Sequence, residues 1–192
     1  MPLNIPILLT WLRIVLIPLM IAVYYVPESW LCGVGRNLAA TLIFVVAGVT
    51  DWLDGYLARR LDQTSAFGAF LDPVADKLMV AAALIMLVQL DRLDAIIATI
   101  IIGREITISA LREWMAQIGA HRSVAVSMIG KIKTTAQMVA IPLLLYQAPI
   151  DGFDVRQAGI WLIYVAAVLT LWSMGYYMRM AWPRIVEQDR KR

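Results

Sequence analysis

The sequence has few charged side chains, a single cysteine and a single histidine. Charged residues make up 16% of its 192 residues and apolar residues 61%, whereas an average soluble domain has about 25% charged and about 45–50% apolar residues. Because Cys32 stands alone, neither a disulfide within the chain nor a cysteine-based metal cluster can form. The net charge of +3 is too mild for a nucleic-acid-binding protein, so we expect no nucleic-acid partner. This composition is typical of an integral membrane protein.

Long apolar segments dominate the chain. A membrane-spanning helix needs about 20 mostly apolar residues. Six segments approach this length, at residues 5–26, 37–58, 73–90, 94–115, 129–147 and 159–180, and residues 65–72 would extend the short third one. The connections contain the glycine, proline, aspartate and asparagine expected of turns. We therefore predict an all-α integral membrane protein, a bundle of six transmembrane helices in which residues 1–192 form a single domain.

Four aspartates lie close together between two of these apolar segments: Asp51, Asp54, Asp72 and Asp76. Such carboxylates are costly unless they are paired, bind a metal or face a water-filled cavity. Residues three or four apart share one helix face, so two adjacent helices would direct all four side chains at one volume. Two divalent cations would cancel their combined charge, and all-oxygen ligands suit Mg²⁺ or Mn²⁺. Paired metals of this kind stabilise both oxygens of a phosphoryl displacement.

Small residues and one arginine accompany the acids. Gly55 and Ala58 leave a groove beside them, and Gly68 lies one turn before Asp72 if that segment is helical. Absent side chains let an anionic ligand approach the backbone. Arg59 carries a planar guanidinium suited to phosphate oxygens.

The start of the third helix has two interpretations. Asp72 is its N-cap with Pro73 at the first helical position, or the helix begins near Ser65 and passes a kink at Pro73. Both place Asp72 and Asp76 near the same cavity.

The stretch from Asp51 to Asp76 reads DWLDGYLARRLDQTSAFGAFLDPVAD. Its acids, glycines, alanine and arginine resemble, at every defining position, the signature of the CDP-alcohol phosphotransferase family, integral-membrane enzymes of phospholipid synthesis. Three further stretches resemble a bacterial branch of that family whose acceptor is sn-glycerol 3-phosphate: NIPILLTWLRIVLIP, REITISALREWMAQIG and SVAVSMIGKIKTTAQMVA. The resemblance covers most of the chain and weakens at residues 27–36, residues 147–158 and the C-terminal tail.

The resemblance implies that a phosphatidyl group passes from CDP-diacylglycerol to sn-glycerol 3-phosphate, with release of CMP. It implies two divalent cations, Mg²⁺ or Mn²⁺, one held by Asp51, Asp54 and Asp72 and the other by Asp51, Asp72 and Asp76. Asp76 is also the candidate base for the acceptor hydroxyl, and its two roles stay open. A homodimer among membrane lipids is implied as well.

The donor CDP-diacylglycerol is expected to contact the small residues, the arginine and the first helix: Gly55, Ala58, Arg59, Gly68, Asn4, Thr10 and Arg13. The part played by the first helix is implied by the resemblance. The residues alone would make Asn4 and Thr10 ordinary helix-end residues.

The acceptor phosphate needs its own cations, because the metals and Arg59 would be occupied by the donor. Basic residues of the fourth helix, the loop after it and the fifth helix are the candidates: Arg104, Arg112, Arg122, Lys131 and Lys133. The alternatives are internal ion pairs for the arginines and extension toward lipid headgroups for the lysines. Because the two lysines point to different sides of a regular helix, we expect only one to enter the cavity fully.

Parts of this pattern also occur in proteins with other acceptors or other functions. Within the family, the acceptor could be inositol phosphate, serine or phosphatidylglycerol. A membrane prenyltransferase also uses aspartates and magnesium, but it needs a second acidic motif, which this chain lacks. A cation channel or transporter would leave the glycines and arginine beside the acids unexplained.

Lysine and arginine collect on one side of the predicted bundle: Arg59, Arg60, Arg122, Arg179, Arg184, Arg190, Lys191 and Arg192. The opposite side holds three: Arg36, Arg92 and Arg156. Basic connections stay in the cytoplasm. We therefore expect a multi-pass protein of the bacterial inner membrane, with both termini and the acid cluster facing the cytoplasm.

This orientation predicts that a reporter enzyme fused to the C-terminus is active in the cytoplasm. Fusions to the connection near Arg92 should show the reverse. A C-terminal reporter active only in the periplasm would overturn the orientation of the acid cluster as well.

Overall fold

The computed structural model describes residues 5–61, 66–117, 128–150 and 152–189; within these ranges it leaves out the side chains of residues 5, 6, 54–61, 66, 69, 128–131, 184, 185 and 187–189. The described chain forms six α-helices and one short 3₁₀ helix: α1 (Ile5–Ala22), η1 (Val23–Tyr25), α2 (Gly33–Leu61), α3 (Ala66–Gln89), α4 (Ala95–Gln117), α5 (Met128–Tyr146) and α6 (Val155–Asp189). The predicted number of helices and their order are confirmed, α2 and α6 are longer than expected, and α3 includes residues 66–72 of the predicted extension.

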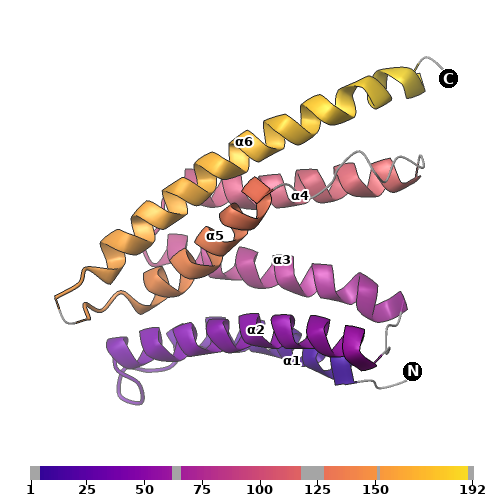
Figure 1. The fold of residues 1–192 in the computed structure, drawn as a ribbon. Coiled ribbons are helices and arrows are strands. Elements are labelled where there is room, and N and C mark those ends of the chain that lie inside the picture. Colours follow the sequence, from indigo (N-terminus) through magenta and orange to yellow (C-terminus); the bar gives the residue numbers. More distant parts are fainter. Residues whose placement is uncertain (1–4, 62–65, 118–127, 151, 190–192) are drawn as a thin grey trace.

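The helices pack side by side along one common direction (Figure 1). Helix α1 packs on α2 and α3, α2 on α5, α5 on α6, and α4 on α3 and α6. Figure 1 shows that α1 begins and α6 ends at the same end of the molecule, where α2 ends and α3 begins. The connections from α3 to α4 and from α5 to α6 lie at the opposite end.

Helix α3 settles the two interpretations of Pro73. The helix begins at Ala66 and contains Pro73 in its interior, so Asp72 is a helical residue and not an N-cap. Asp72 and Asp76 are consequently one turn apart on one face of α3.

Small residues allow the helices to approach closely. Alanines on several of the described helices are fully buried, for example Ala40 on α2, Ala75 and Ala83 on α3, and Ala140 on α5. Larger buried side chains such as Phe44 fill the space between them. Close backbone approach through small residues is the usual way in which helices pack within membranes.

The outer surface carries many large apolar side chains, including Trp11 on α1, Val49 on α2 and Trp172 on α6. Three helices contain stretches long and apolar enough to cross a membrane: Ile7–Tyr25, Gly33–Leu53 and Val155–Pro183. Exposed apolar surface on this scale is typical of a membrane protein. Helix α5 contains a shorter apolar stretch, Ile132–Tyr146.

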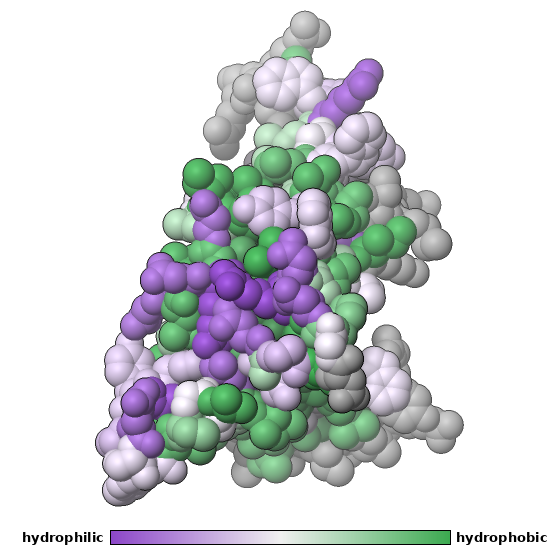
Figure 2. Space-filling model, turned by 90° about the vertical axis from the view of Figure 1, so that its left-hand side faces the viewer, coloured by the Kyte–Doolittle hydropathy of each residue, from purple (hydrophilic) through white to green (hydrophobic). Residues whose placement is uncertain are grey.

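Polar residues gather at the end of the molecule opposite the termini, which faces the viewer in Figure 2. Arg92, between α3 and α4, ties several helices together at this end. Its guanidinium donates hydrogen bonds of 3.3 Å and 2.7 Å to the carbonyls of Leu144 and Leu145, and one of 2.7 Å to Oδ1 of Asn37. It also lies 5.9 Å from the centroid of the Tyr24 ring. Arg92 therefore satisfies the last carbonyls of α5 and joins α5 to α2.

Replacing Arg92 with alanine should lower the free energy of unfolding by about 2–4 kcal/mol, because hydrogen bonds to a charged group contribute about 1.5–3 kcal/mol. Denaturant titration of the purified protein in mixed micelles would measure this. Arg156→Ala is the matched control, since Arg156 is exposed at the start of α6. An equal effect of the two substitutions would contradict the role assigned to Arg92.

Candidate functional site

Five helices enclose a cavity of about 470 Å³. The aspartates on its wall come from α2 and α3, and the arginines come from α4. The lining residues that matter for the chemistry are Asp51, Asp72, Asp76, Lys77, Arg104, Glu105, Arg112, Thr134, Gln137 and Tyr177. The cavity thus brings together three of the four predicted aspartates and both arginines predicted on α4.

Arg13 lies between acids of two different helices. Its side chain is fully buried, and its Nη1 is 2.8 Å from Oδ1 of Asp51. The same nitrogen donates to Oδ1 of Asp76. The two carboxylates keep 40% and 46% of their side-chain surface exposed, so they also face the cavity. A buried guanidinium is costly unless it is paired, and here two partners compensate its charge.

Thr10, one turn before Arg13 on α1, also contacts an acid of another helix. It is buried, and its hydroxyl donates a 2.5 Å hydrogen bond to Oδ1 of Asp72. Because Thr10 and Arg13 are three residues apart, they share a face of α1. Thr10 lies inside α1, so the alternative that it is a helix-end residue is wrong. The first helix holds the acids of α2 and α3 in place.

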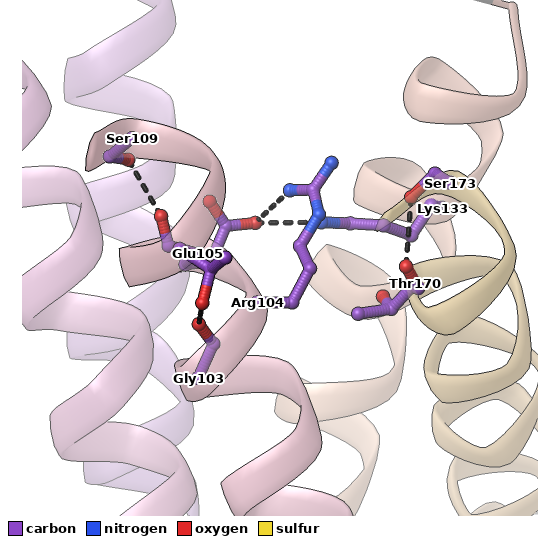
Figure 3. Close-up of polar contacts among 8 residues, drawn as sticks. Gly103, Arg104, Glu105, Ser109, Lys133, Thr170 and Ser173 are labelled. Atoms are coloured by element: carbon purple, nitrogen blue, oxygen red, sulfur yellow. Dashed lines mark hydrogen bonds and ion pairs between the residues drawn. The ribbon is translucent and has the colours of Figure 1, made fainter. Parts of the chain in front are cut away.

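A second charged cluster lies between α4 and α5 (Figure 3). Oε1 of Glu105 is 2.7 Å from Nη1 of Arg104 and 2.6 Å from Nζ of Lys133. Arg104 is 7% exposed and Lys133 only 1% exposed. One carboxylate therefore serves two buried cations, which leaves a net positive charge beside the cavity.

Arg112 lies two turns further along α4 and is exposed to the cavity. Its Cζ is 5.8 Å from the centroid of the Tyr177 ring, a cation–π contact with α6. Arg104 and Arg112 therefore share a side of α4, because both line the cavity. The ion pair of Arg104 with Glu105 means that the alternative, internal pairing, also holds in part.

The other predicted site residues are placed less fully. Gly68 is buried on α3, one turn before Asp72. The backbones of Asp54, Gly55, Ala58 and Arg59 belong to α2 and that of Lys131 to α5, with their side chains outside the description. Asn4 and Arg122 lie outside the described residues altogether.

The described acids do not form a ready metal site. Within the described ranges, no three histidine, cysteine or acidic side chains are grouped as the ligands of one metal ion would be. The guanidinium of Arg13 contacts both Asp51 and Asp76, and the side chain of Asp54 is not described. The predicted four-aspartate metal site therefore stays a prediction.

Sequence reasoning did not assign Lys77, Glu105, Gln137 or Tyr177 to the site. Adjacency to Arg104 was the signal available for Glu105. Gln137 follows Lys133 by four residues and therefore shares its face of α5. Tyr177 carries no local signal, because its place on the cavity depends on how α6 packs against α4.

The chain is similar to known proteins over nearly its whole length. The family model for CDP-alcohol phosphatidyltransferase matches residues 3–172. The protein named CDP-diacylglycerol–glycerol-3-phosphate 3-phosphatidyltransferase of Escherichia coli strain K12 is 52% identical over 190 residues, which is 98% of this chain and 100% of that protein. Proteins of the same name from Shigella sonnei and Shigella boydii match with the same identity and coverage. The chain belongs to the CDP-alcohol phosphatidyltransferase family.

Proposed function

We propose that this protein transfers the phosphatidyl group of CDP-diacylglycerol to sn-glycerol 3-phosphate, giving phosphatidylglycerophosphate and CMP. The acceptor hydroxyl oxygen forms a bond to the phosphorus that carries the diacylglycerol, and the bond from that phosphorus to CMP breaks. The observation that carries the proposal is the single cavity with acids from α2 and α3 on one wall and cations from α4 on another. The names of the full-length relatives support the same activity.

The acid wall suits divalent cations. Asp51, Asp72 and Asp76 offer carboxylate oxygens to one cavity, the donor type that Mg²⁺ and Mn²⁺ prefer. A positive group, the guanidinium of Arg13, already contacts two of them. With Asp54, one turn from Asp51 on α2, these residues would hold two Mg²⁺ or Mn²⁺ ions. When bound, such ions neutralise the donor pyrophosphate and the charge that develops on the departing CMP.

Asp76 is the proposed base. Its carboxylate faces the cavity and accepts the proton of the attacking hydroxyl, while the contact with Arg13 orients it. Thr10 orients Asp72 in the same way through its 2.5 Å hydrogen bond. The donor is held by the rest of the acidic segment, with Arg59 on its phosphates and Gly55, Ala58 and Gly68 allowing close approach, and by the start of the chain at Asn4.

The cationic wall is proposed to bind the acceptor phosphate. Arg104 and Lys133 share one carboxylate, so their charge is only half neutralised and favours an anion. Arg112 adds a third cation that is exposed to the cavity. Arg122 and Lys131 belong to the same proposed set. A pocket of this kind rejects plain glycerol, because its cations would be left unpaired.

The architecture extends this proposal. We infer that all six helices span the bacterial inner membrane, that residues 1–192 form one domain and that two copies form a homodimer. Asp72 lies near the start of α3 and Arg112 near the end of α4. These two lining residues therefore belong to the half of the molecule where α1 begins and α6 ends (Figure 1). The basic residues of that end favour a cytoplasmic site. Helix α2, with 29 residues, would be about 43 Å long, enough to cross the bilayer.

Purified protein in micelles should release CMP from CDP-diacylglycerol only when sn-glycerol 3-phosphate and Mg²⁺ or Mn²⁺ are present. Excess EDTA should abolish the release. Full turnover in EDTA would refute the metal assignment. Release driven equally by inositol phosphate, serine or phosphatidylglycerol would refute the acceptor. Turnover of prenyl diphosphate or ion flux would favour the other classes of protein.

Asp76→Asn should lower turnover by more than the ~10²–10⁴-fold typical of losing a general base, because a metal ligand is lost too.

Lys133→Gln and Arg112→Gln should each raise the KM for sn-glycerol 3-phosphate by about 10- to 100-fold, the loss expected from one charged hydrogen bond. The KM for CDP-diacylglycerol should change little. Arg179→Gln is the control, because Arg179 is exposed on α6 and outside the proposed pocket. Two-substrate kinetics on these variants would decide the matter: equal increases in both constants would point to a structural role.

A further inference from the structure

Gln137 is a buried polar residue of the cavity whose amide oxygen has no partner in the described part of the chain. Its side chain is 4% exposed and lines the cavity. Its Oε1 is inaccessible to solvent, and no described residue hydrogen-bonds to it. Nearly all buried polar atoms of folded proteins have such a partner, so this oxygen is a candidate contact for a bound molecule.

The position of Gln137 limits what it can bind. It follows Lys133 by one turn on α5 and therefore lies beside the cationic cluster of Glu105, Arg104 and Lys133. Helix α5 also packs on α2, which carries Asp51. An amide oxygen is neutral and accepts hydrogen bonds, so it repels phosphate oxygens and attracts a hydroxyl hydrogen.

The acceptor of the proposed reaction carries one hydroxyl to which the proposed function assigns no residue. Its phosphate lies with the cations and its attacking primary hydroxyl with Asp76. The secondary hydroxyl, on the middle carbon, loses its water when it enters the cavity and needs a new partner.

We propose that Gln137 is a specificity-determining residue whose Oε1 accepts a hydrogen bond from the secondary hydroxyl of sn-glycerol 3-phosphate. This inference rests on the proposed function. It explains why an unpaired amide oxygen belongs to a residue that lines the same cavity as the aspartates of α2 and α3 and the arginines of α4. It also gives the site a means of rejecting three-carbon phosphates without that hydroxyl, because they leave the buried oxygen unpaired.

The test compares two acceptors, sn-glycerol 3-phosphate and 3-hydroxypropyl phosphate, which lacks only the secondary hydroxyl. The unmodified protein should prefer the former by about 10- to 100-fold in kcat/KM. Gln137→Met and Gln137→Leu remove the oxygen, and each should lower kcat/KM for sn-glycerol 3-phosphate by that factor while leaving the analogue's value nearly unchanged. Gln137→Glu keeps an acceptor oxygen and should keep the preference, although its charge lowers both values.

Thr170→Val is the matched control. Thr170 on α6 is also fully buried, its Oγ1 lacks a partner among the described residues, and it is outside the described cavity lining. This substitution should leave the preference unchanged.

Three outcomes would overturn the inference. The first is an equal loss of kcat/KM on both acceptors in the Met and Leu variants, which would indicate a structural role. The second is an unmodified protein with no preference for sn-glycerol 3-phosphate. The third is a preference for sn-glycerol 3-phosphate that survives in both variants. Failure of the proposed function itself looks different, because the unmodified protein would then release no CMP with either acceptor. Thermal unfolding of each variant in micelles establishes that it is folded, and the two oxygen-removing variants back each other up.

Discussion

The buried guanidinium of Arg13 is the constraint on which the acid wall depends. A charge removed from water costs several kcal/mol unless it is paired, and Arg13 finds its partners on two other helices, Asp51 on α2 and Asp76 on α3. The three helices can therefore pack only in a register that brings these side chains together. The contacts of Arg13 that hold these helices together therefore also position the proposed metal ligands.

The cationic wall follows the same rule with the signs reversed. Glu105 on α4 is the shared partner of Arg104 and of Lys133 on α5. In each cluster one charged group pairs with two groups of the opposite charge. The acid wall therefore keeps a net negative charge and the cationic wall a net positive charge, and each can attract a ligand of the opposite sign. The acid wall would attract the divalent cations that bind the donor pyrophosphate. The cationic wall would attract the phosphate of the acceptor.

Helix positions and helix faces were predictable because both depend on local sequence. Apolar runs predicted the six helices, and the helical period placed Asp72 with Asp76. The start of α3 was not predictable, because Pro73 is compatible both with the first turn and with a helix interior. Tyr177 was missed for a related reason: on its own helix it does not differ from an ordinary core residue.

The sequence by itself determined the helices, the apolar exterior, the acidic segment and the family, since each depends on residues that are close neighbours along the chain. Only the tertiary structure decided that Arg13 meets Asp76, 63 residues away, and that Lys133 meets Glu105, 28 residues away. The period of a helix relates residues within about one turn. Which faces of different helices meet is set by close packing of small residues such as Ala47 and Ala140, and by the need of each buried charge for a partner.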